Sequence, residues 1–484
     1  MNVKVISRNV GYALLVSALF MFFSILVSMA NGNDSALAAL LISFTITFTV
    51  GIFPFIFVRK SADISLKDGY MIIALSWLLS FIFGMLPYAL WGGPFTIINA
   101  WFESVSGFTT TGATILDNVE ALPNSLLFWR SSTHFIGGLG VVVFLLLIIP
   151  SSSQMRLRLT SLELSSLSKR EYKSGANKTV YIFTYVYFGM LVASFVLYMA
   201  AGMTPFDAIN HAMSVTSTGG FSTRNLSIGA YDSVAIDLIT MLFMLLSSIH
   251  FGMVFVALAT RSLRPFRNEI FKFYLFTLLA ASLIVTVSLK VHGIEESWGR
   301  ALLSGSFHIL SFASTTGFSI ADNTVWPALP SAMLVFVGIW CGMAGSTSGG
   351  VKSDRALLLC KEIKYQLRMV LHPASVNEVR VNGRVVRQED VAPHMLYTAL
   401  FFMVVIISMS ICLVLNPEDG NALPAILTSL SNVGLSVGDL GSIHSFNAEP
   451  SAAKFVYSLD MFLGRVEIYP ILAVVMMIFS RRNK

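Results

Sequence analysis

Four short polar strings, each containing a glycine, interrupt the apolar pattern of this sequence of 484 residues. They read TTTGAT (109–114), STGGFS (217–222), STTGFS (314–319) and SNVGLS (431–436), and they recur at intervals of about a hundred residues. The strings hold no acidic residue, so their oxygen atoms are neutral. Neutral oxygen ligands suit a weakly hydrated monovalent cation better than a divalent cation, which usually recruits carboxylates.

The candidate cation ligands are the glycine of each string and the two residues before it. In chain order they are Thr110, Thr111 and Gly112, then Thr218, Gly219 and Gly220, then Thr315, Thr316 and Gly317, and finally Asn432, Val433 and Gly434. Glycine adopts backbone conformations that are closed to other residues, so carbonyl oxygens can turn toward one axis and replace the hydration shell of a cation. Four strings in register indicate one shared site.

A second unusual segment reads GMAGSTSGGVKS (342–353) and contains Gly345, Ser346, Thr347, Ser348, Gly349 and Gly350. A run this rich in glycine and small polar residues does not form a regular helix. It differs from a phosphate-binding loop because Lys352 does not follow a glycine and no strand precedes the run. Two interpretations remain at this point: a cytoplasmic turn that ends a helix, or a flexible loop inside the membrane.

Arg465 lies within the last long apolar run, in the string MFLGRVE (461–467). An ionisable residue at membrane depth is costly and usually faces a cavity. The sequence leaves two roles open for Arg465, a charge beside a pore or a structural pair with a carboxylate of another helix. Glu467 is two residues away and would not face Arg465 on a regular helix.

Enzymatic and cofactor chemistry have no visible site in this sequence. The eight histidines lack zinc-binding spacings, no nucleotide fingerprint occurs, and the three cysteines lie far apart in or beside apolar segments. The chain is therefore expected not to be an enzyme and to bind no organic cofactor.

The segments that must position these residues are predicted membrane spans, since 55% of the residues are hydrophobic and only 12% are charged. Long apolar runs cover 10–30, 36–58, 70–91, 126–149, 180–201, 235–260, 271–292, 331–351, 394–415 and 456–480. Each run is near the ~20 residues that cross a bilayer core, which predicts ten spanning helices. The first run resembles a signal peptide, but its apolar stretch is long, so a retained helix is the expectation.

The positions of the basic residues predict the orientation. All but six of the 32 Lys and Arg residues lie near the termini or in the loops around 59–69, 150–179, 261–272 and 352–393. Basic loops stay on the cytoplasmic side, so both termini are expected inside. The formal charge of +6 then reflects topology, and no basic soluble face for nucleic acid is expected.

Each polar string follows an apolar segment too short to span the membrane and precedes a full span, so the repeated unit is helix, half-helix, polar loop and helix. Irregular backbone survives at membrane depth only when it is buried in protein or lines a water-filled path. The predicted fold is an all-α membrane protein with four pseudo-symmetric helix, pore loop, helix repeats around a central pore, plus two extra N-terminal helices.

The expected division of the chain follows these repeats. It places two extra helices at 1–68, repeat 1 at 69–150, a cytoplasmic linker at 151–179, repeat 2 at 180–262, repeat 3 with the glycine-rich run at 263–358, a cytoplasmic segment at 359–393 and repeat 4 at 394–484. Within the cytoplasmic segment, Asn382-Gly383 between alternating apolar residues predicts a β-hairpin that could dock a soluble partner.

With its four glycine strings and two leading helices, the chain resembles the Trk, Ktr and HKT superfamily of potassium transporters, and most closely the bacterial TrkH branch. The resemblance implies that Gly112, Gly220, Gly317 and Gly434 are the key glycines of a potassium selectivity filter. Gly112 argues for potassium, since members that favour sodium carry serine there. The resemblance also favours an intramembrane gating loop at 345–350 and a pore-facing Arg465.

Further expectations come only from this resemblance. They are a homodimer in the bacterial inner membrane and a cytosolic regulatory ring of the TrkA type that binds ATP or ADP and NAD in place of this chain. The alternative function is a sodium- or proton-coupled potassium symporter. Such carriers often use inverted repeats and midplane carboxylates, whereas these four repeats run in one sense. A membrane enzyme or scaffold is the least favoured class.

Overall fold

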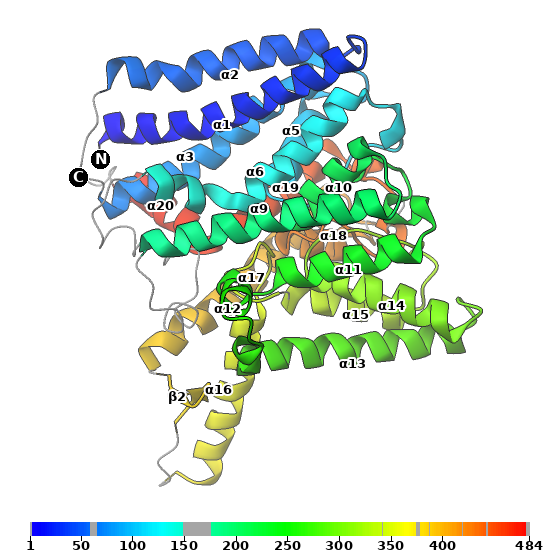
Figure 1. Cartoon of the computed structure of the whole chain (residues 1–484). Coiled ribbons are helices and arrows are strands. Elements are labelled where there is room, and N and C mark those ends of the chain that lie inside the picture. The colour runs from blue at the N-terminus through cyan, green and yellow to red at the C-terminus, as the bar shows by residue number, and fades with distance from the viewer. Residues whose placement is uncertain are drawn as a thin grey trace.

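The computed structural model describes residues 2–58, 65–148, 176–340, 342–373, 378–386, 388–418, 420–441 and 444–480. Long helices lie side by side, and the start of α1 and the end of α20 lie at the same end of the bundle (Figure 1). The predicted all-α membrane fold is confirmed within these ranges, apart from one small hairpin. Most of the predicted linker at 151–179 lies outside the described residues.

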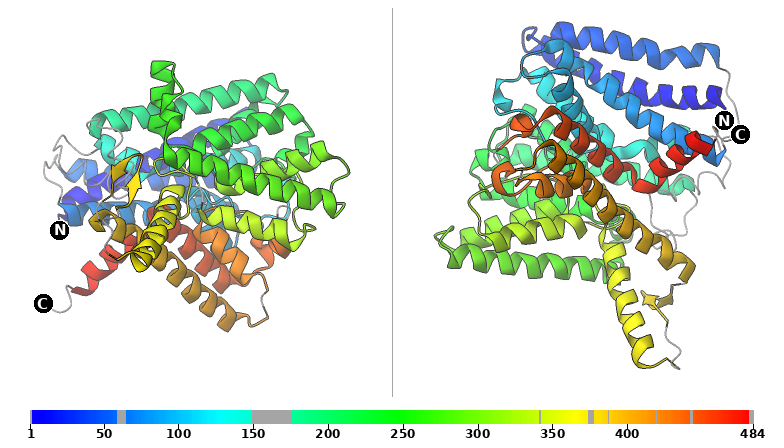
Figure 2. Two further views of the ribbon diagram at one scale, coloured as in Figure 1. Left: turned by 90° about the horizontal axis from the view of Figure 1, so that it is seen from below. Right: turned by 180° about the vertical axis from the view of Figure 1, so that it is seen from behind.

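The two extra N-terminal helices, α1 (Val3–Ala30) and α2 (Leu37–Phe57), pack along each other at one edge of the molecule (Figures 1 and 2). Gly11 permits this close approach, because a Cβ atom on it would lie 2.6 Å from the carbonyl oxygen of Gly51. Small residues at such contacts are typical of membrane helix pairs, which gain stability from close packing.

Four repeats follow, each with an outer helix, a half-helix and an inner helix. The outer helices are α3 (Leu66–Gly84) with its continuation α4 (Leu86–Trp91), α9 (Ala176–Ala200), α13 (Glu269–Val291) and α17 (Gln388–Leu415). The half-helices are α5 (Ile97–Phe108), α10 (Pro205–Thr216), α14 (Trp298–Ala313) and α18 (Ala422–Leu430). The inner helices are α6 (Asn124–Ile148), α11 (Val234–Ser248) with α12 (Phe251–Thr260), α15 (Ala328–Trp340) with α16 (Ser353–Leu371), and α19 (Ser451–Val466) with α20 (Ile468–Ser480).

Short 3-10 helices lie in the connections, at η1 (Val119–Ala121), η2 (Ser227–Tyr231), η3 (Arg264–Arg267), η4 (Gly438–Leu440) and η5 (Phe446–Ala448). Three half-helices begin at a side-chain cap, because Thr96, Thr204 and Ser297 each accept a hydrogen bond from the backbone N–H three residues later. These caps fix where each half-helix starts.

Six predicted spans are single helices long and apolar enough to cross a membrane, which makes the chain a multi-pass membrane protein. Ten spanning helices were predicted, but the inner helix of every repeat is interrupted, and the sequence indicated this only for repeat 3, through its glycine-rich run. The helix α6 has a non-helical residue at Gly140, α11 and α12 meet at 106°, α15 ends at Trp340, and α19 and α20 are separated at Glu467. Hydropathy records an apolar environment, but it does not detect a break in the backbone.

The predicted hairpin is confirmed, and its strands β1 (Arg380–Val381) and β2 (Arg384–Val385) pair antiparallel. Asn382 and Gly383 form the turn with φ of +50° and +72°, which matches a type I′ turn. The hairpin is attached to the start of α13, because the backbone N–H of Glu269 donates to Asn382 Oδ1 at 2.7 Å.

Candidate functional site

Each polar string leaves its half-helix through the same hydrogen-bonded turn. In repeat 1, Thr111 N–H donates to the carbonyl of Ser106 at 2.9 Å and Thr110 N–H donates to Gly107 at 3.1 Å. In the other repeats, the bond equivalent to that of Thr111 runs from Gly219 N–H to Ser214, from Thr316 N–H to Ser311 and from Val433 N–H to Thr428, each at 2.9 Å. This is the Schellman pattern of a helix end. Its fourfold recurrence gives the repeats a common geometry.

Two left-handed residues, two positions apart, follow in every string. The first is Thr110, Thr218, Thr315 or Asn432, with φ between +53° and +58°. The second is Gly112, Gly220, Gly317 or Gly434, with φ between +77° and +84°. A β-branched threonine at positive φ is an outlier that costs ~1–3 kcal/mol and persists only when its surroundings impose it. Two positive-φ residues at this spacing make the backbone of each string irregular in the same way.

The four strings close into a ring in chain order. A Cβ atom on Gly112 would collide with the carbonyl oxygen of Gly219, and one on Gly220 would collide with that of Thr316. The same relation joins Gly317 to the carbonyl of Val433 and Gly434 to the carbonyl of Thr111, which returns to repeat 1. Each of the four key glycines therefore lies against a backbone carbonyl of a neighbouring repeat. This contact brings the predicted ligand residues of the four strings together.

Hydrogen bonds on the outer side also join each repeat to the next. Val119 N–H donates to Asn225 at 2.7 Å, Gly229 N–H to Ser319 at 3.1 Å, Asn323 to Ser436 at 3.2 Å and Phe446 N–H to Thr114 at 2.8 Å. Within the ring itself, Asn432 Nδ2 donates to Thr111 Oγ1 at 2.9 Å. These bonds hold the strings in place, as a rigid ligand shell requires.

Buried polar residues of three half-helices support the ends of the strings and the backbone that follows them. Glu103 accepts from Thr114 and Ile115, His211 contacts Ser222 Oγ at 2.8 Å, and His308 contacts the carbonyl of Ala321 at 3.2 Å. These contacts give the three residues a structural role. His134 lies behind the second string, where its ring stacks on Phe221 with centroids 4.0 Å apart.

Arg130 is the partner that sequence reasoning missed. Its Nε donates to Glu103 at 2.7 Å, with both side chains almost fully buried, and its guanidinium lies 3.9 Å from the ring centroid of Phe221. An arginine on the outer half of a predicted span was a detectable signal, because a charge there needs a partner.

We expect Glu103→Gln to destabilise the protein by ~3–5 kcal/mol, because it leaves the buried charge of Arg130 without its partner. The melting temperature of the purified protein, followed by tryptophan fluorescence, measures the effect. Glu378→Gln is the matched control, since Glu378 pairs with Arg380 at the exposed surface and such pairs contribute ~0–1 kcal/mol. Equal small shifts in the two variants would contradict the role given to Glu103.

The glycine-rich run lies directly against the inner side of the ring. Gly349 N–H donates to Thr315 Oγ1 at 3.0 Å, and Thr347 Oγ1 donates to the carbonyl of Thr216 at 3.3 Å. Thr347 and Ser348 are only 4% and 2% exposed, so this segment is not an exposed cytoplasmic turn. Positive φ at Gly345 and Gly350 allows the chain to reverse here.

Arg465 connects two elements beneath the ring. Its Nη1 donates to the carbonyl of Thr347 at 2.6 Å and its Nη2 to the carbonyl of Gly137 at 2.9 Å, so it bridges the glycine-rich run and α6. Glu467, at the break between α19 and α20, instead pairs with Arg355 at 2.8 Å and lies 3.7 Å from Lys352. The guanidinium of Arg465 thus anchors the glycine-rich run through a hydrogen bond to the backbone carbonyl of Thr347.

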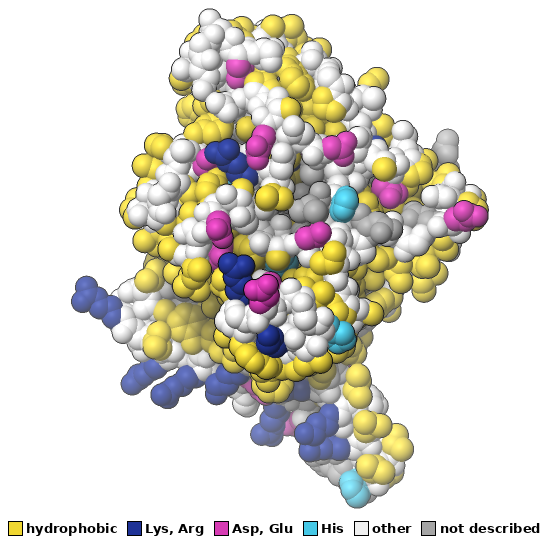
Figure 3. All heavy atoms as spheres, turned by 90° about the vertical axis from the view of Figure 1, so that its right-hand side faces the viewer, with side chains coloured by type: hydrophobic (Ala, Val, Ile, Leu, Met, Phe, Trp, Pro, Cys, Tyr) yellow, Lys and Arg dark blue, Asp and Glu magenta, His cyan; other side chains and the backbone are white. Residues whose placement is uncertain are grey.

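On the end of the bundle opposite the termini, acidic side chains are scattered over the surface with a few basic side chains among them, whereas most basic side chains in the view lie toward its lower part (Figure 3). Exposed acidic residues of these loops include Asp117, Glu120 and Asp232. Nearby, Asp207 accepts a 2.8 Å hydrogen bond from Arg224, which raises the pKa of that guanidinium above its usual range. A negative surface at this end raises the local concentration of cations.

In the described part of the chain, no group of three or more His, Cys, Asp or Glu residues is placed to hold a metal ion. The arrangement that remains is a ring of neutral backbone oxygens, with the C-terminal ends of four half-helices directed at it. Helix C-termini carry partial negative charge, so the ring favours a cation without any carboxylate.

Comparison with known proteins identifies relatives along the whole chain. The family model for TrkH, described as a cation transport protein, matches residues 38–482. The Trk system potassium uptake protein TrkH of Halomonas elongata is 33% identical over 494 residues and covers 100% of both chains. The Trk system potassium uptake protein TrkG of Escherichia coli is 32% identical over 97% of each chain. The crystal structure of the potassium transporter TrkH from Vibrio parahaemolyticus matches with a TM-score of 0.88 at 29% identity, covering 98% of both chains.

Proposed function

The chain belongs to the TrkH family of cation transport proteins, and on this premise we propose that it takes up potassium through the ring formed by its four polar strings. The family assignment confirms the resemblance that the sequence indicated and the expectation of a transporter in place of an enzyme. The observation that carries the proposal is the closed ring, in which every key glycine contacts a carbonyl oxygen of a neighbouring repeat.

Potassium is the proposed cargo because the ring offers uncharged oxygens at fixed positions. The proposed ligands are the carbonyl groups of the three residues predicted in each string, with the threonine hydroxyls as further oxygens. Potassium loses its hydration shell at lower cost than smaller cations, so a ring of neutral dipoles can replace that shell. The names of the relatives in Halomonas elongata and Escherichia coli support the same cargo.

The proposed gate is the glycine-rich run at 345–350 together with Arg465. The run contacts Thr216 and Thr315 from the inner side of the ring, so it occupies the space that an ion leaving the ring would have to enter. Arg465 holds the run in place and adds a fixed positive charge beneath the ring. Opening then requires the run to move away from Thr216 and Thr315, which its glycines permit.

Regulation is proposed to come from outside the chain. A cytosolic ring of TrkA-type subunits would bind the nucleotides and move the gate, and the hairpin at β1 and β2 is a candidate contact for it. The proposed setting is a homodimer in the bacterial inner membrane, with both termini cytoplasmic. The common position of the start of α1 and the end of α20 supports termini on one side of the membrane (Figure 1).

Downhill ion flux into proteoliposomes that contain only the purified chain tests this function. We expect potassium and rubidium to enter without a second ion gradient, and sodium and lithium to enter at least tenfold more slowly. A symporter coupled to sodium or protons gives a different result, because its flux stops when the coupling gradient is absent. Strict dependence on such a gradient would overturn the pore and favour the coupled carrier.

A further inference from the structure

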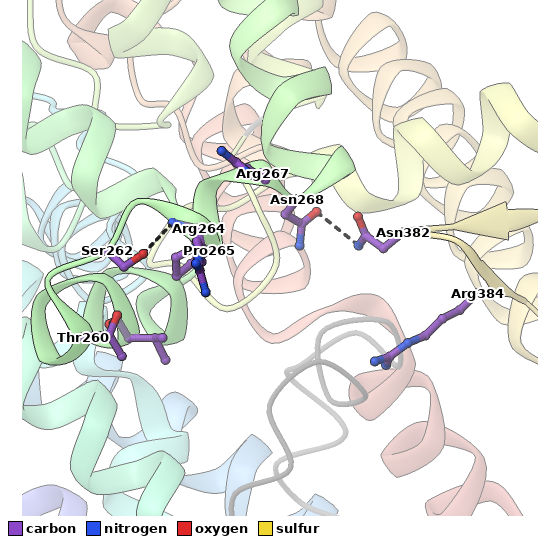
Figure 4. A pocket seen from close by; sticks show the side chains of 9 residues that line it. Thr260, Ser262, Arg264, Pro265, Arg267, Asn268, Asn382 and Arg384 are labelled. Carbon is purple, nitrogen blue, oxygen red and sulfur yellow. Dashed lines mark hydrogen bonds between the residues drawn. The ribbon is translucent and has the colours of Figure 1, made fainter.

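A basic cavity of about 820 Å³ lies between the end of α12, η3, the start of α13 and the hairpin. Its lining includes Thr260, Arg264, Arg267, Asn268, Asn382 and Arg384. Arg264 and Arg384 come from opposite sides of this space, one from η3 and the other from β2 (Figure 4). The ring and the gate do not use this cavity.

Among the described residues, the lining carries three arginines and no acidic residue. Glu269, which follows the lining residue Asn268, is already engaged, because it accepts from Lys361 Nζ at 2.5 Å and from Asn382 N–H at 2.9 Å. Arg264 and Arg267 are exposed, and neither forms an ion pair within the described part of the chain. The cavity therefore keeps a positive charge that an anion can neutralise.

Exposed apolar side chains place the cavity at the edge of the membrane. Leu258 at the end of α12 is 71% exposed and Leu263, next to η3, is 78% exposed. The apolar spanning helix α13 begins at Glu269, directly after the two arginines of η3. Leucines that face outward beside arginines are typical of segments at the membrane interface, where phosphate groups of lipids lie.

The donors in the cavity match a phosphate group. A guanidinium presents parallel N–H donors that bind two phosphate oxygens at once. The volume of the cavity lies within the range that holds a small-molecule headgroup. We propose that this cavity binds the phosphodiester headgroup of an anionic phospholipid from the adjacent leaflet, with Arg264, Arg267 and Arg384 as its charged ligands.

Native mass spectrometry of the full chain in detergent tests this site, with dioleoyl phosphatidylglycerol titrated against dioleoyl phosphatidylcholine. We expect preferential binding of phosphatidylglycerol to the wild type and a loss of about fivefold in affinity for each arginine replaced in Arg264→Gln and Arg267→Gln. Arg264→Lys with Arg267→Lys keeps the charge and should retain most of the binding. Arg300→Gln, an exposed arginine at the opposite end of the bundle, is the matched control and should change nothing.

Three results would overturn the lipid site. Equal affinity of the wild type for the two lipids would remove the need for an anionic ligand. Unchanged binding of phosphatidylglycerol in the glutamine variants would place that lipid elsewhere. Displacement of the lipid by millimolar inorganic phosphate or by soluble glycerophosphoglycerol would identify a site for soluble phosphates. Equal affinity of the wild type for the two lipids overturns the site even if a variant fails to fold, and the lysine variants locate the lipid if a glutamine variant does not fold.

Discussion

Replacement of Gly112 by serine should lower the selectivity of flux for potassium over sodium by at least tenfold. The backbone of Gly112 has φ of +84°, where a side chain is strained, and the added Cβ would collide with the carbonyl oxygen of Gly219 in the next repeat. That carbonyl must turn or withdraw, so the ring changes its diameter at one of four points. Potassium and sodium flux into proteoliposomes, measured side by side, reads out the change.

Gly202→Ser is the matched control for this variant. Gly202 also has a positive φ, of +101°, but a Cβ atom there would have no neighbour within 4 Å. The two variants share the backbone strain, and only Gly112→Ser disturbs the ring. Intact selectivity in Gly112→Ser, or an equal loss in Gly202→Ser, would contradict a filter built from these glycines.

Replacement of Arg465 by glutamine should raise potassium flux through the chain alone by tenfold to a hundredfold. The change removes a unit charge, which at ~6 Å and an effective dielectric constant of about 20 opposes a cation by ~3 kcal/mol. It also weakens the two hydrogen bonds that tie Thr347 and Gly137 together. Proteoliposomes without any regulatory subunit are the right setting, because there the closed state limits the flux.

Arg465→Lys separates the two effects, since it keeps the charge and loses the paired donors. Low flux in the lysine variant together with high flux in the glutamine variant would assign the barrier to charge. High flux in both would assign it to the anchoring of the glycine-rich run. Unchanged flux in both variants would rule out Arg465 as part of the gate.

The repeat architecture could be predicted from the sequence because its signals are local. A polar glycine string, a short apolar segment before it and a long one after it are visible in one dimension. The hairpin was equally local, since Asn382-Gly383 specifies its own turn. The division of the chain into domains remains a prediction, and so do the roles of the filter and gate residues.

The contacts between repeats could not be predicted, because they join residues far apart in the chain. Nothing near Glu103 indicates that Arg130 is its partner, and nothing near Arg465 indicates the carbonyls of Thr347 and Gly137. The breaks in the inner helices of repeats 1, 2 and 4 were missed for another reason, whereas the glycine-rich run indicated the break in repeat 3. Isoleucine and glutamate, as at Ile249 and Glu467, are residue types that often occur inside helices. Their local sequence therefore predicts a continuous helix, and tertiary contacts override that preference.

The most direct test of the central claim is a crystal structure from crystals grown with rubidium or thallium salts, in which anomalous scattering locates the cation. The ring account predicts density on the axis between the four strings, close to the carbonyl oxygens of Thr111, Gly219, Thr316 and Val433. Density at another membrane site, such as the buried carboxylate Asp460, together with none inside the ring, would contradict a pore built from these four loops.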